Sequence, residues 1–204
     1  MRPLFRPVLA LCVLASLGAC SLRQDIPPVE HYVLQLPPPQ AAATRRPETL
    51  RVAPVRVAPT FASAQLVYRL DEVRYVSDFY HRLMAPPGAM ISTRTTEWLD
   101  QGGPLRFTAA PGSTATQRFL LDLHVLEFYG DFRPGQPAAA VLVLQASLTE
   151  PARPTQAPLF ERTFRQRVAL SQSTPAALVE GQSRALAAVL TELQPLLAAS
   201  LPPP

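Results

Sequence analysis

Residues 118–132 read RFLLDLHVLEFYGDF, a run in which apolar and polar side chains alternate. This period of two is typical of a β-strand with one face in the core, with Asp122 and His124 on the opposite face. The apolar positions that share the core face are Phe119, Leu121, Leu123 and Val125. Residues 138–149 follow as an almost unbroken apolar run, as expected of a strand buried on both faces, and residues 160–170 alternate again. Short, turn-rich links join the three segments, so they predict an antiparallel meander.

A helix is predicted after the meander, over residues 174–199. Thr174 is suited to the N-cap and Pro175 to the first helical position, where its missing N–H costs nothing. Leucines then recur with the helical spacing of a core-facing stripe. These are Leu186, Leu190, Leu193 and Leu197. Pro195 is expected to kink or fray the last turn.

The segments before residue 118 add shorter strands and a second helix. Pro54 lies within a strand candidate at residues 50–58, so that element is expected to be an edge strand or to carry a bulge. The second helix is expected over about residues 87–100. The other strand candidates are residues 31–36, 65–70, 73–83 and 105–109. Together the segments predict one α+β domain with a mixed, largely antiparallel sheet of about five or six strands and the helices packed on one side.

The first 20 residues have the layout of a secretory signal that ends in a cysteine. Two arginines precede a short apolar stretch, residues 8–17, and the small residues Gly18 and Ala19 precede Cys20. A membrane-spanning helix would need about 20 apolar residues, more than this stretch contains. The cysteine at the cleavage point makes the segment similar to a bacterial lipobox, in which the thiol receives lipid, such as palmitate, and becomes the first mature residue. The alternative is an ordinary signal peptide with an incidental cysteine.

The signal implies an organisation and a location for the chain. Cys12 would leave with the signal, so Cys20 would be the single mature cysteine, and neither an internal disulfide nor a cysteine metal site could form. Ser21 follows Cys20, and by resemblance to known lipoprotein sorting a residue other than Asp there favours the inner leaflet of the outer membrane, facing the periplasm. The expected parts are a signal peptide at 1–19, a lipidated tether at 20–30, a periplasmic domain at 31–200 and a disordered tail at 201–204.

The charge pattern does not point to a nucleic-acid partner. All 19 basic residues are arginine, against 15 acidic residues, for a formal net charge of +4. The arginines are dispersed, and no block of like charges occurs that would bind a phosphate backbone. The composition, with its 24 prolines, is more typical of a GC-rich genome than of nucleic-acid recognition.

Residues suited to catalysis or metal binding are few and scattered. The histidines His31, His81 and His124 lack paired spacing, and no nucleophile elbow, phosphate-binding loop or dinucleotide fingerprint is present. Ser77, Asp78 and His81 match a catalytic trio by type, but on an extended strand Asp78 would point away from the other two. The sequence therefore predicts a protein that is not an enzyme, with no catalytic residue, metal or cofactor.

Aromatic and arginine side chains gather between residues 68 and 98. They are Tyr68, Tyr75, Phe79, Tyr80 and Trp98, interleaved with Arg69, Arg74 and Arg82. Tyr, Trp and Arg are the residue types most enriched in interface hot spots. Phe79 and Trp98 are expected in the core between strand and helix. Tyr68, Arg69 and Arg82 are compatible with either core or interface, because hydroxyl and guanidinium groups need partners or water.

Residues 66–70 (LVYRL) and 73–87 (VRYVSDFYHRLMAPP) resemble the auxiliary lipoproteins of ABC-type transport systems, the PqiC-like family. The family pattern is a Tyr-Arg pair, an aromatic-rich strand, and then His/Arg-Trp-Ala-x-Pro-Pro before a helix; here Leu83-Met84 stands where a tryptophan is often found. An early Tyr-Val-Leu segment and a closing amphipathic helix fit the same layout. The matched positions, to which the resemblance gives fold or interface roles, are Tyr68, Arg69, Tyr75, His81 and Arg82.

The resemblance also implies a task. Such lipoproteins accompany a permease, an ATPase and a periplasmic MCE-domain protein in systems that move lipids between the two membranes. It implies an outer-membrane-anchored subunit that docks on the MCE component, with a homo-oligomeric ring as one arrangement. Two alternatives stay open: a free-standing periplasmic lipid-binding lipoprotein, which would need a deep apolar cavity, and an assembly factor for an outer-membrane protein or exporter.

Overall fold

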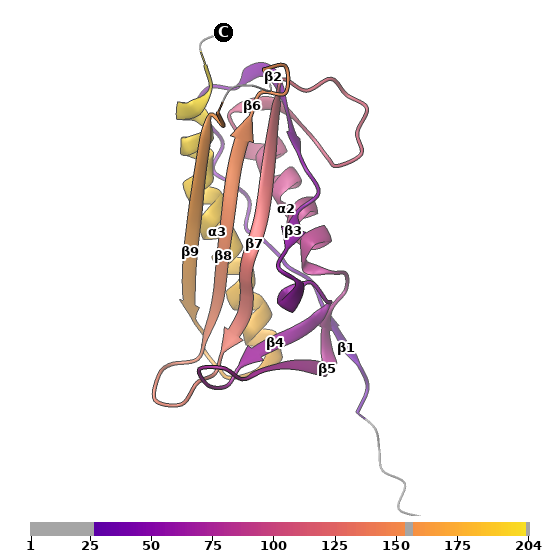
Figure 1. Ribbon diagram of the computed structural model, residues 1–204, viewed down its shortest axis with the longest axis vertical. Helices are drawn as coiled ribbons and strands as arrows, with labels where there is room; N and C mark the ends of the chain where they lie inside the picture. The colour runs from indigo at the N-terminus through magenta and orange to yellow at the C-terminus, as the bar shows by residue number, and fades with distance from the viewer. Residues whose placement is uncertain (1–26, 154–156, 203–204) are drawn as a thin grey trace, which may run out of the picture.

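The computed structural model describes residues 27–153 and 157–202. The predicted signal peptide, Cys20 and the tether up to residue 26 lie outside the described residues, as do the last two residues of the predicted tail. The described parts form one domain of two α-helices, a short 3-10 helix and nine strands (Figure 1). The bounds are β1 Glu30–Tyr32, β2 Arg46–Val52, β3 Arg56–Val57, η2 Pro59–Phe61, β4 Gln65–Arg69, β5 Tyr75–Leu83, α2 Pro87–Gly102, β6 Leu105–Ala109, β7 Phe119–Asp131, β8 Ala139–Thr149, β9 Phe160–Ala169 and α3 Pro175–Ser200.

The nine strands form one mixed sheet organised around β7. This strand pairs antiparallel with β8 and parallel with β2, β3 and β4. Five of the eight strand pairings are parallel, so the prediction of a largely antiparallel sheet of five or six strands is wrong, while the prediction of one mixed α+β domain is confirmed. The difference has a physical cause: β2 and β4 reach β7 through long connections, and parallel pairing requires a crossover of about a dozen residues or more.

The predicted meander forms the long part of the sheet. β7, β8 and β9 pair antiparallel in sequence order, as the alternation indicated. In Figure 1, α3 lies behind this part of the sheet and contacts β8 and β9, whereas α2 contacts β6, β2 and β3. No helix is drawn in front of the meander. The four predicted core positions of β7 are fully buried, and the leucine stripe of α3 is buried with them. These residues are Phe119, Leu121, Leu123, Val125, Leu186, Leu190, Leu193 and Leu197.

The start of α3 follows the predicted capping signal, and its end extends beyond Pro195. The Thr174 hydroxyl caps the helix by accepting a hydrogen bond from the Ala177 N–H at 3.3 Å. The helix continues past Pro195 as far as Ser200. Leu201 then packs into the core, and the next carbonyl group accepts a hydrogen bond from the Arg46 guanidinium at 2.6 Å. The described residues of the expected tail therefore lie against the domain.

Pro54 interrupts the strand predicted at residues 50–58. β2 ends before it and β3 begins after it, and both pair with the same strand, β7. Because proline lacks the N–H that a ladder needs, the chain leaves the sheet at Pro54 and returns. β2 lies between β6 and β7, whereas β3 pairs with β7 alone, so the single strand expected at residues 50–58 is two strands separated at Pro54.

The β4–β5 hairpin lies at one end of the long strands. The β4 residue Arg69 pairs with Asp131 at the end of β7, whereas Leu50 of β2 pairs with Phe119 at its start. In Figure 1 the hairpin crosses the lower end of the molecule, and the C-terminal end of α3 lies at the top. β1 pairs with the last residues of β5, so the chain enters the domain at the hairpin end.

Candidate interaction site

The β4–β5 hairpin carries the matched motif and an unusual amount of exposed apolar surface. Among the described residues, the exposed large apolar side chains are Val29, Val33, Val73, Tyr75, Val76, Phe79, Met84 and Phe107. All but Phe107 belong to β1, the hairpin or the residues next to them. The prediction that Trp98 is buried is confirmed, whereas Phe79 is 59% exposed, so its predicted core position is wrong. The Phe79 ring contacts Tyr80 and the Arg82 guanidinium instead of a helix.

A bulge in β5 gathers three polar residues of the motif. The register of the hairpin shifts between Gln65 and Val67, and the extra residues on β5 begin at Asp78. One Asp78 carboxylate oxygen, Oδ1, accepts hydrogen bonds from the backbone N–H groups of Tyr80, at 2.9 Å, and His81, at 3.1 Å. The side chain thus replaces ladder partners, as aspartate often does in turns.

The bulge brings Asp78 and His81 together, so the expectation that they point to opposite faces is wrong. His81 Nδ1 lies 2.7 Å from Asp78 Oδ2, and the Tyr68 hydroxyl donates to the same oxygen at 2.9 Å. Among the described residues, no hydrogen bond joins Ser77 to either partner. The arrangement is a carboxylate held by several donors without a nucleophile beside it, which suits a structural role better than a catalytic one.

The pKa values of this group agree with a fixed carboxylate. Burial raises the pKa of Asp78, but the hydrogen bonds from Tyr68, His81 and the backbone outweigh it, so the net shift is downward. Burial, together with the neighbouring carboxylate, raises the pKa of Tyr68 well above its usual range. At neutral pH the pair is therefore an ionised acceptor and a protonated donor.

Arg69 and Tyr75 secure the other half of the hairpin. The Arg69 guanidinium lies 5.6 Å from the centre of the Tyr75 ring and donates to the backbone carbonyl groups of Asp71 and Glu72, each at 3.1 Å. Tyr75 packs edge-on against Tyr129 of β7, with ring centres 5.4 Å apart. Of the five matched positions, four thus hold the hairpin in place. The fifth, Arg82, donates to the Phe79 carbonyl group at 2.9 Å and covers the exposed ring.

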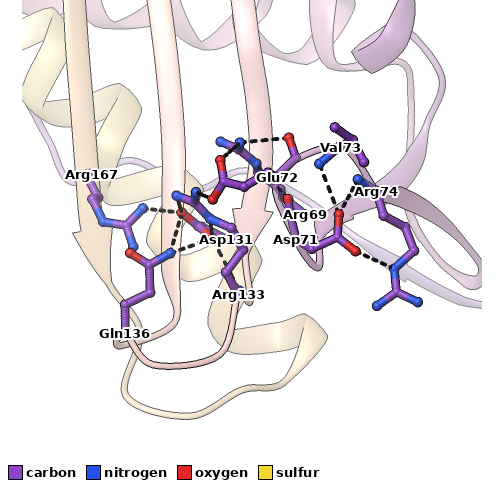
Figure 2. A network of polar contacts seen from close by, with 9 residues as sticks. All are labelled: Arg69, Asp71, Glu72, Val73, Arg74, Asp131, Arg133, Gln136 and Arg167. Atoms are coloured by element: carbon purple, nitrogen blue, oxygen red, sulfur yellow. Dashed lines mark hydrogen bonds and ion pairs between the residues drawn. The ribbon is translucent and has the colours of Figure 1, made fainter.

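A buried carboxylate that the sequence analysis missed supports the tip of the hairpin (Figure 2). The Asp131 side chain is fully buried and accepts hydrogen bonds from Arg133, at 2.9 and 3.0 Å, from Arg167, at 2.6 Å, and from Gln136. Arg133 also pairs with Glu72, which in turn pairs with Arg69 of the hairpin. This Asp131 network joins β9, the β7–β8 loop and the β4–β5 turn.

One sequence signal could have indicated the network. Asp131 ends β7 directly after the uncharged residues 128–130, and Arg133 follows two positions later. A carboxylate that leaves water must be paired, so an acid in such a run predicts a nearby arginine. Hydrogen bonds from Arg133 hold the pKa of Asp131 well below its usual range, against the opposing effect of burial.

Replacing Tyr68 by phenylalanine should lower the free energy of unfolding by about 1.5–3 kcal/mol, because the hydrogen bond from the Tyr68 hydroxyl to the partly buried Asp78 carboxylate is lost. Urea unfolding at neutral pH measures this. Tyr80→Phe is the control, since no hydrogen bond of the Tyr80 hydroxyl occurs among the described residues, and it should change the value by less than about 0.5 kcal/mol. Equal effects of the two substitutions would contradict a specific role for the Tyr68–Asp78 bond.

The described residues add no sign of a metal centre or a membrane-spanning helix. They contain no cluster of three or more His, Cys, Asp or Glu side chains placed to hold a metal ion. No helix among them is long and apolar enough to cross a lipid bilayer. The features that stand out among the described residues are the exposed apolar hairpin and the two polar groups that support it.

Comparison with solved structures shows the fold. A crystal structure of a Xanthomonas campestris protein matches with a TM-score of 0.73 and 21% identity, over 84% of this chain and 96% of that chain. A hypothetical protein from Chlamydia trachomatis matches with a TM-score of 0.55 and 9% identity, over 76% and 99%. At these identities the likeness concerns the fold alone. No curated protein matches the sequence.

Comparison with protein families shows the family to which this chain belongs. The family described as ABC-type transport auxiliary lipoprotein component matches residues 32–194, which include every strand from β2 to β9 and most of α3. The five matched motif positions lie inside this range. The chain therefore belongs to the family of ABC-type transport auxiliary lipoproteins, as its central motif led us to expect.

Proposed function

We propose that this chain is the non-enzymatic, outer-membrane-anchored lipoprotein subunit of an ABC/MCE-type system that moves lipids between the two membranes. In this proposal it docks on the periplasmic MCE component. The family match over residues 32–194 carries the proposal, because an auxiliary component of an ABC system assists transport while the ATPase supplies the energy. The lipobox-like segment before Cys20 supports the anchor, and Ser21 supports the outer membrane as its location.

The distribution of exposed aromatic side chains supports a bridging role. A subunit between a membrane and a periplasmic partner needs surfaces at two ends. Phe79 is exposed at the hairpin end, where the chain enters the domain, and Phe107 is 47% exposed on β6. β6 pairs with β2, which lies at the start of β7, so the two phenylalanines lie near opposite ends of the long strands. Aromatic side chains that remain in water are candidates for contact with a partner.

Photochemical crosslinking in cells tests the docking. The chain contains no lysine, so amine-reactive reagents are unsuitable, and a photoreactive amino acid should replace Phe107 or, separately, Phe79. We expect at least one position to give a covalent adduct with an MCE-domain protein upon irradiation. The same experiment run in a strain without the MCE gene is the control, and the adduct should disappear there.

Other results would favour the alternatives. No MCE adduct from either position, together with no co-purification, would contradict the docking. Phospholipid co-purifying with the domain would favour a lipid carrier. A surface groove of about 620 Å³ lies between residues 37–43 and α3, and its lining includes the apolar Trp98 and Pro195 beside the polar Gln194. Loss of one outer-membrane protein upon gene deletion would favour an assembly factor. Crosslinked ladders of the chain itself would support a homo-oligomeric ring.

A further inference from the structure

We propose that the exposed apolar side chains of the β4–β5 hairpin rest in the phospholipid surface to which the chain is anchored, so that the domain stands on the membrane at this end. By hairpin apolar side chains we mean Val73, Val76, Phe79 and Met84. The proposal rests on the proposed lipidation of Cys20 and adds a second contact to it. It leaves the opposite end, with Phe107, free for a periplasmic partner.

The hairpin apolar side chains are strongly exposed for their types. Their exposed fractions are 89% for Val73, 42% for Val76, 59% for Phe79 and 64% for Met84. Apolar groups of this size gain free energy when they leave water, and a concentration of them on one element marks a site of contact with a protein or a membrane. The remaining question is which of the two lies there.

The length of the tether favours lipid. Pro27, the first described residue, lies seven positions after Cys20, and an extended chain over seven steps spans at most roughly 25 Å. Three residues later β1 pairs side by side with His81, Arg82 and Leu83 of β5. A lipidated Cys20 therefore holds the hairpin next to the bilayer. Phe107 lies beyond the start of β7, and the twelve-residue step from Phe119 to Asp131 alone is about 40 Å.

The charges at the tip are already paired within the protein. Asp71 accepts hydrogen bonds from the backbone N–H groups of Val73 and Arg74 and pairs with the Arg74 side chain at 3.2 Å. Glu72 pairs with Arg69 and Arg133 (Figure 2). Each of these acidic groups therefore already has a partner within the protein. For this reason, contact of the hairpin with the membrane should not require anionic lipid or low salt. Zwitterionic phosphatidylcholine is sufficient in this proposal.

The hairpin is held rigidly in this exposed position. The Asp131 network fixes its turn from one side, and the Tyr68–Asp78–His81 group fixes the bulge from the other. A rigid surface loses little conformational entropy upon contact with its partner. The Arg82 guanidinium lies over the Phe79 ring, with its central carbon 4.9 Å from the ring centre, so a positive charge accompanies this exposed ring to the headgroup level. Interfacial apolar side chains of this kind enter the bilayer by about 5–10 Å.

Site-specific fluorescence on the lipidated full-length product tests the proposal. Cys20 would be acylated, so a cysteine introduced elsewhere is the single free thiol of the mature chain. The variants Val73→Cys, Val76→Cys and, as the matched control, Phe107→Cys are labelled with an environment-sensitive dye and reconstituted into phosphatidylcholine vesicles. We expect dyes at 73 and 76 to shift to the blue and to be quenched by lipid-borne nitroxides several-fold more strongly than the dye at 107, with no dependence on salt.

Each outcome separates this proposal from the anchor on which it rests. Vesicle-bound protein whose dyes at 73 and 76 stay in water, like the dye at 107, would overturn the hairpin contact and leave the anchor intact. Blue-shifted dyes that lipid nitroxides do not quench would overturn it in favour of a contact with a second copy or a protein partner. Protein that does not float with the vesicles would overturn the anchor and this proposal together.

Discussion

Replacing Asp131 by alanine should lower the free energy of unfolding by about 3 kcal/mol, because it removes the acceptor at the centre of a buried network. Arg133 and Arg167 would lose their shared carboxylate. Removal of one partner of a buried ion pair usually costs about 3–5 kcal/mol, and the low end applies here because both arginines reach water and can be hydrated. Urea unfolding followed through Trp98, the single tryptophan and a buried one, measures the change.

Glu97→Ala is the matched control for Asp131→Ala. It also removes a carboxylate from an arginine, but the Arg94–Glu97 pair lies on the surface of α2, where ion pairs contribute about 0–1 kcal/mol. If the two substitutions cost the same, the Asp131 network does not stabilise the fold in the way that its geometry indicates.

The same residue should make stability depend on pH in acid. The folded-state pKa of Asp131 lies below its unfolded value, so its contribution is complete above the unfolded pKa of about 3.9 and decreases as the pH falls below it. Asp131→Asn should therefore be less stable than the unsubstituted protein at pH 7, and the difference should narrow below about pH 4. A difference that stays constant down to acid would assign the effect to lost hydrogen bonds alone.

The parts of the fold that could be predicted from sequence are those with local signals. The meander and α3 follow from alternation and helical spacing, which depend only on neighbouring residues. The burial of Phe119 and Leu186 on facing elements is the direct result. The parallel pairings of β2 and β4 with β7 depend on contacts between residues far apart in sequence, such as Arg69 and Asp131, and no local pattern indicates them.

The residues of the hairpin motif could be named from the sequence, but their geometry could not, and an interface role for them stays a prediction. Strict alternation failed in β5 because Asp78 bonds to the backbone two and three residues ahead and opens a bulge. An aspartate within a strand is a warning of this, since its side chain competes for backbone donors. The exposure of Phe79 has the same origin. Its residue type alone would place it in the core, but it lies in the bulged segment, away from the helices.

The geometry divides the matched motif into two groups. Tyr68, Arg69, Tyr75 and His81 hold the hairpin, and Arg82 with Phe79 remains at the surface. Substitutions in the first group should therefore act through stability, whereas substitutions in the second should act through contact with a surface. A motif that serves both purposes cannot be divided by residue type, because tyrosine and arginine are suited to each.

Replacing Cys20 by alanine should abolish lipid attachment altogether. The thiol is the group that receives lipid in a lipobox, so cells grown with labelled palmitate should incorporate label into the unsubstituted protein and none into the variant. Cys12→Ala is the matched control, since that cysteine lies in the apolar stretch of the signal and should leave labelling unchanged. Label that persists after Cys20→Ala would contradict the proposed anchor.

The loss of lipid should then release the domain from the membrane once an ordinary cleavable signal replaces residues 1–19. Each methylene group of an acyl chain contributes about 0.8 kcal/mol to membrane binding, so one chain binds marginally and two or more bind stably. The hairpin apolar side chains lie on a folded surface and enter lipid only at its edge, so they can orient the domain but cannot replace acyl chains. We therefore expect the Cys20→Ala protein in the soluble fraction of cell extracts, and the Cys12→Ala lipoprotein in the membrane pellet. A variant that stays in the pellet without lipid would mean that a protein partner, and not the acyl chains, holds the domain there.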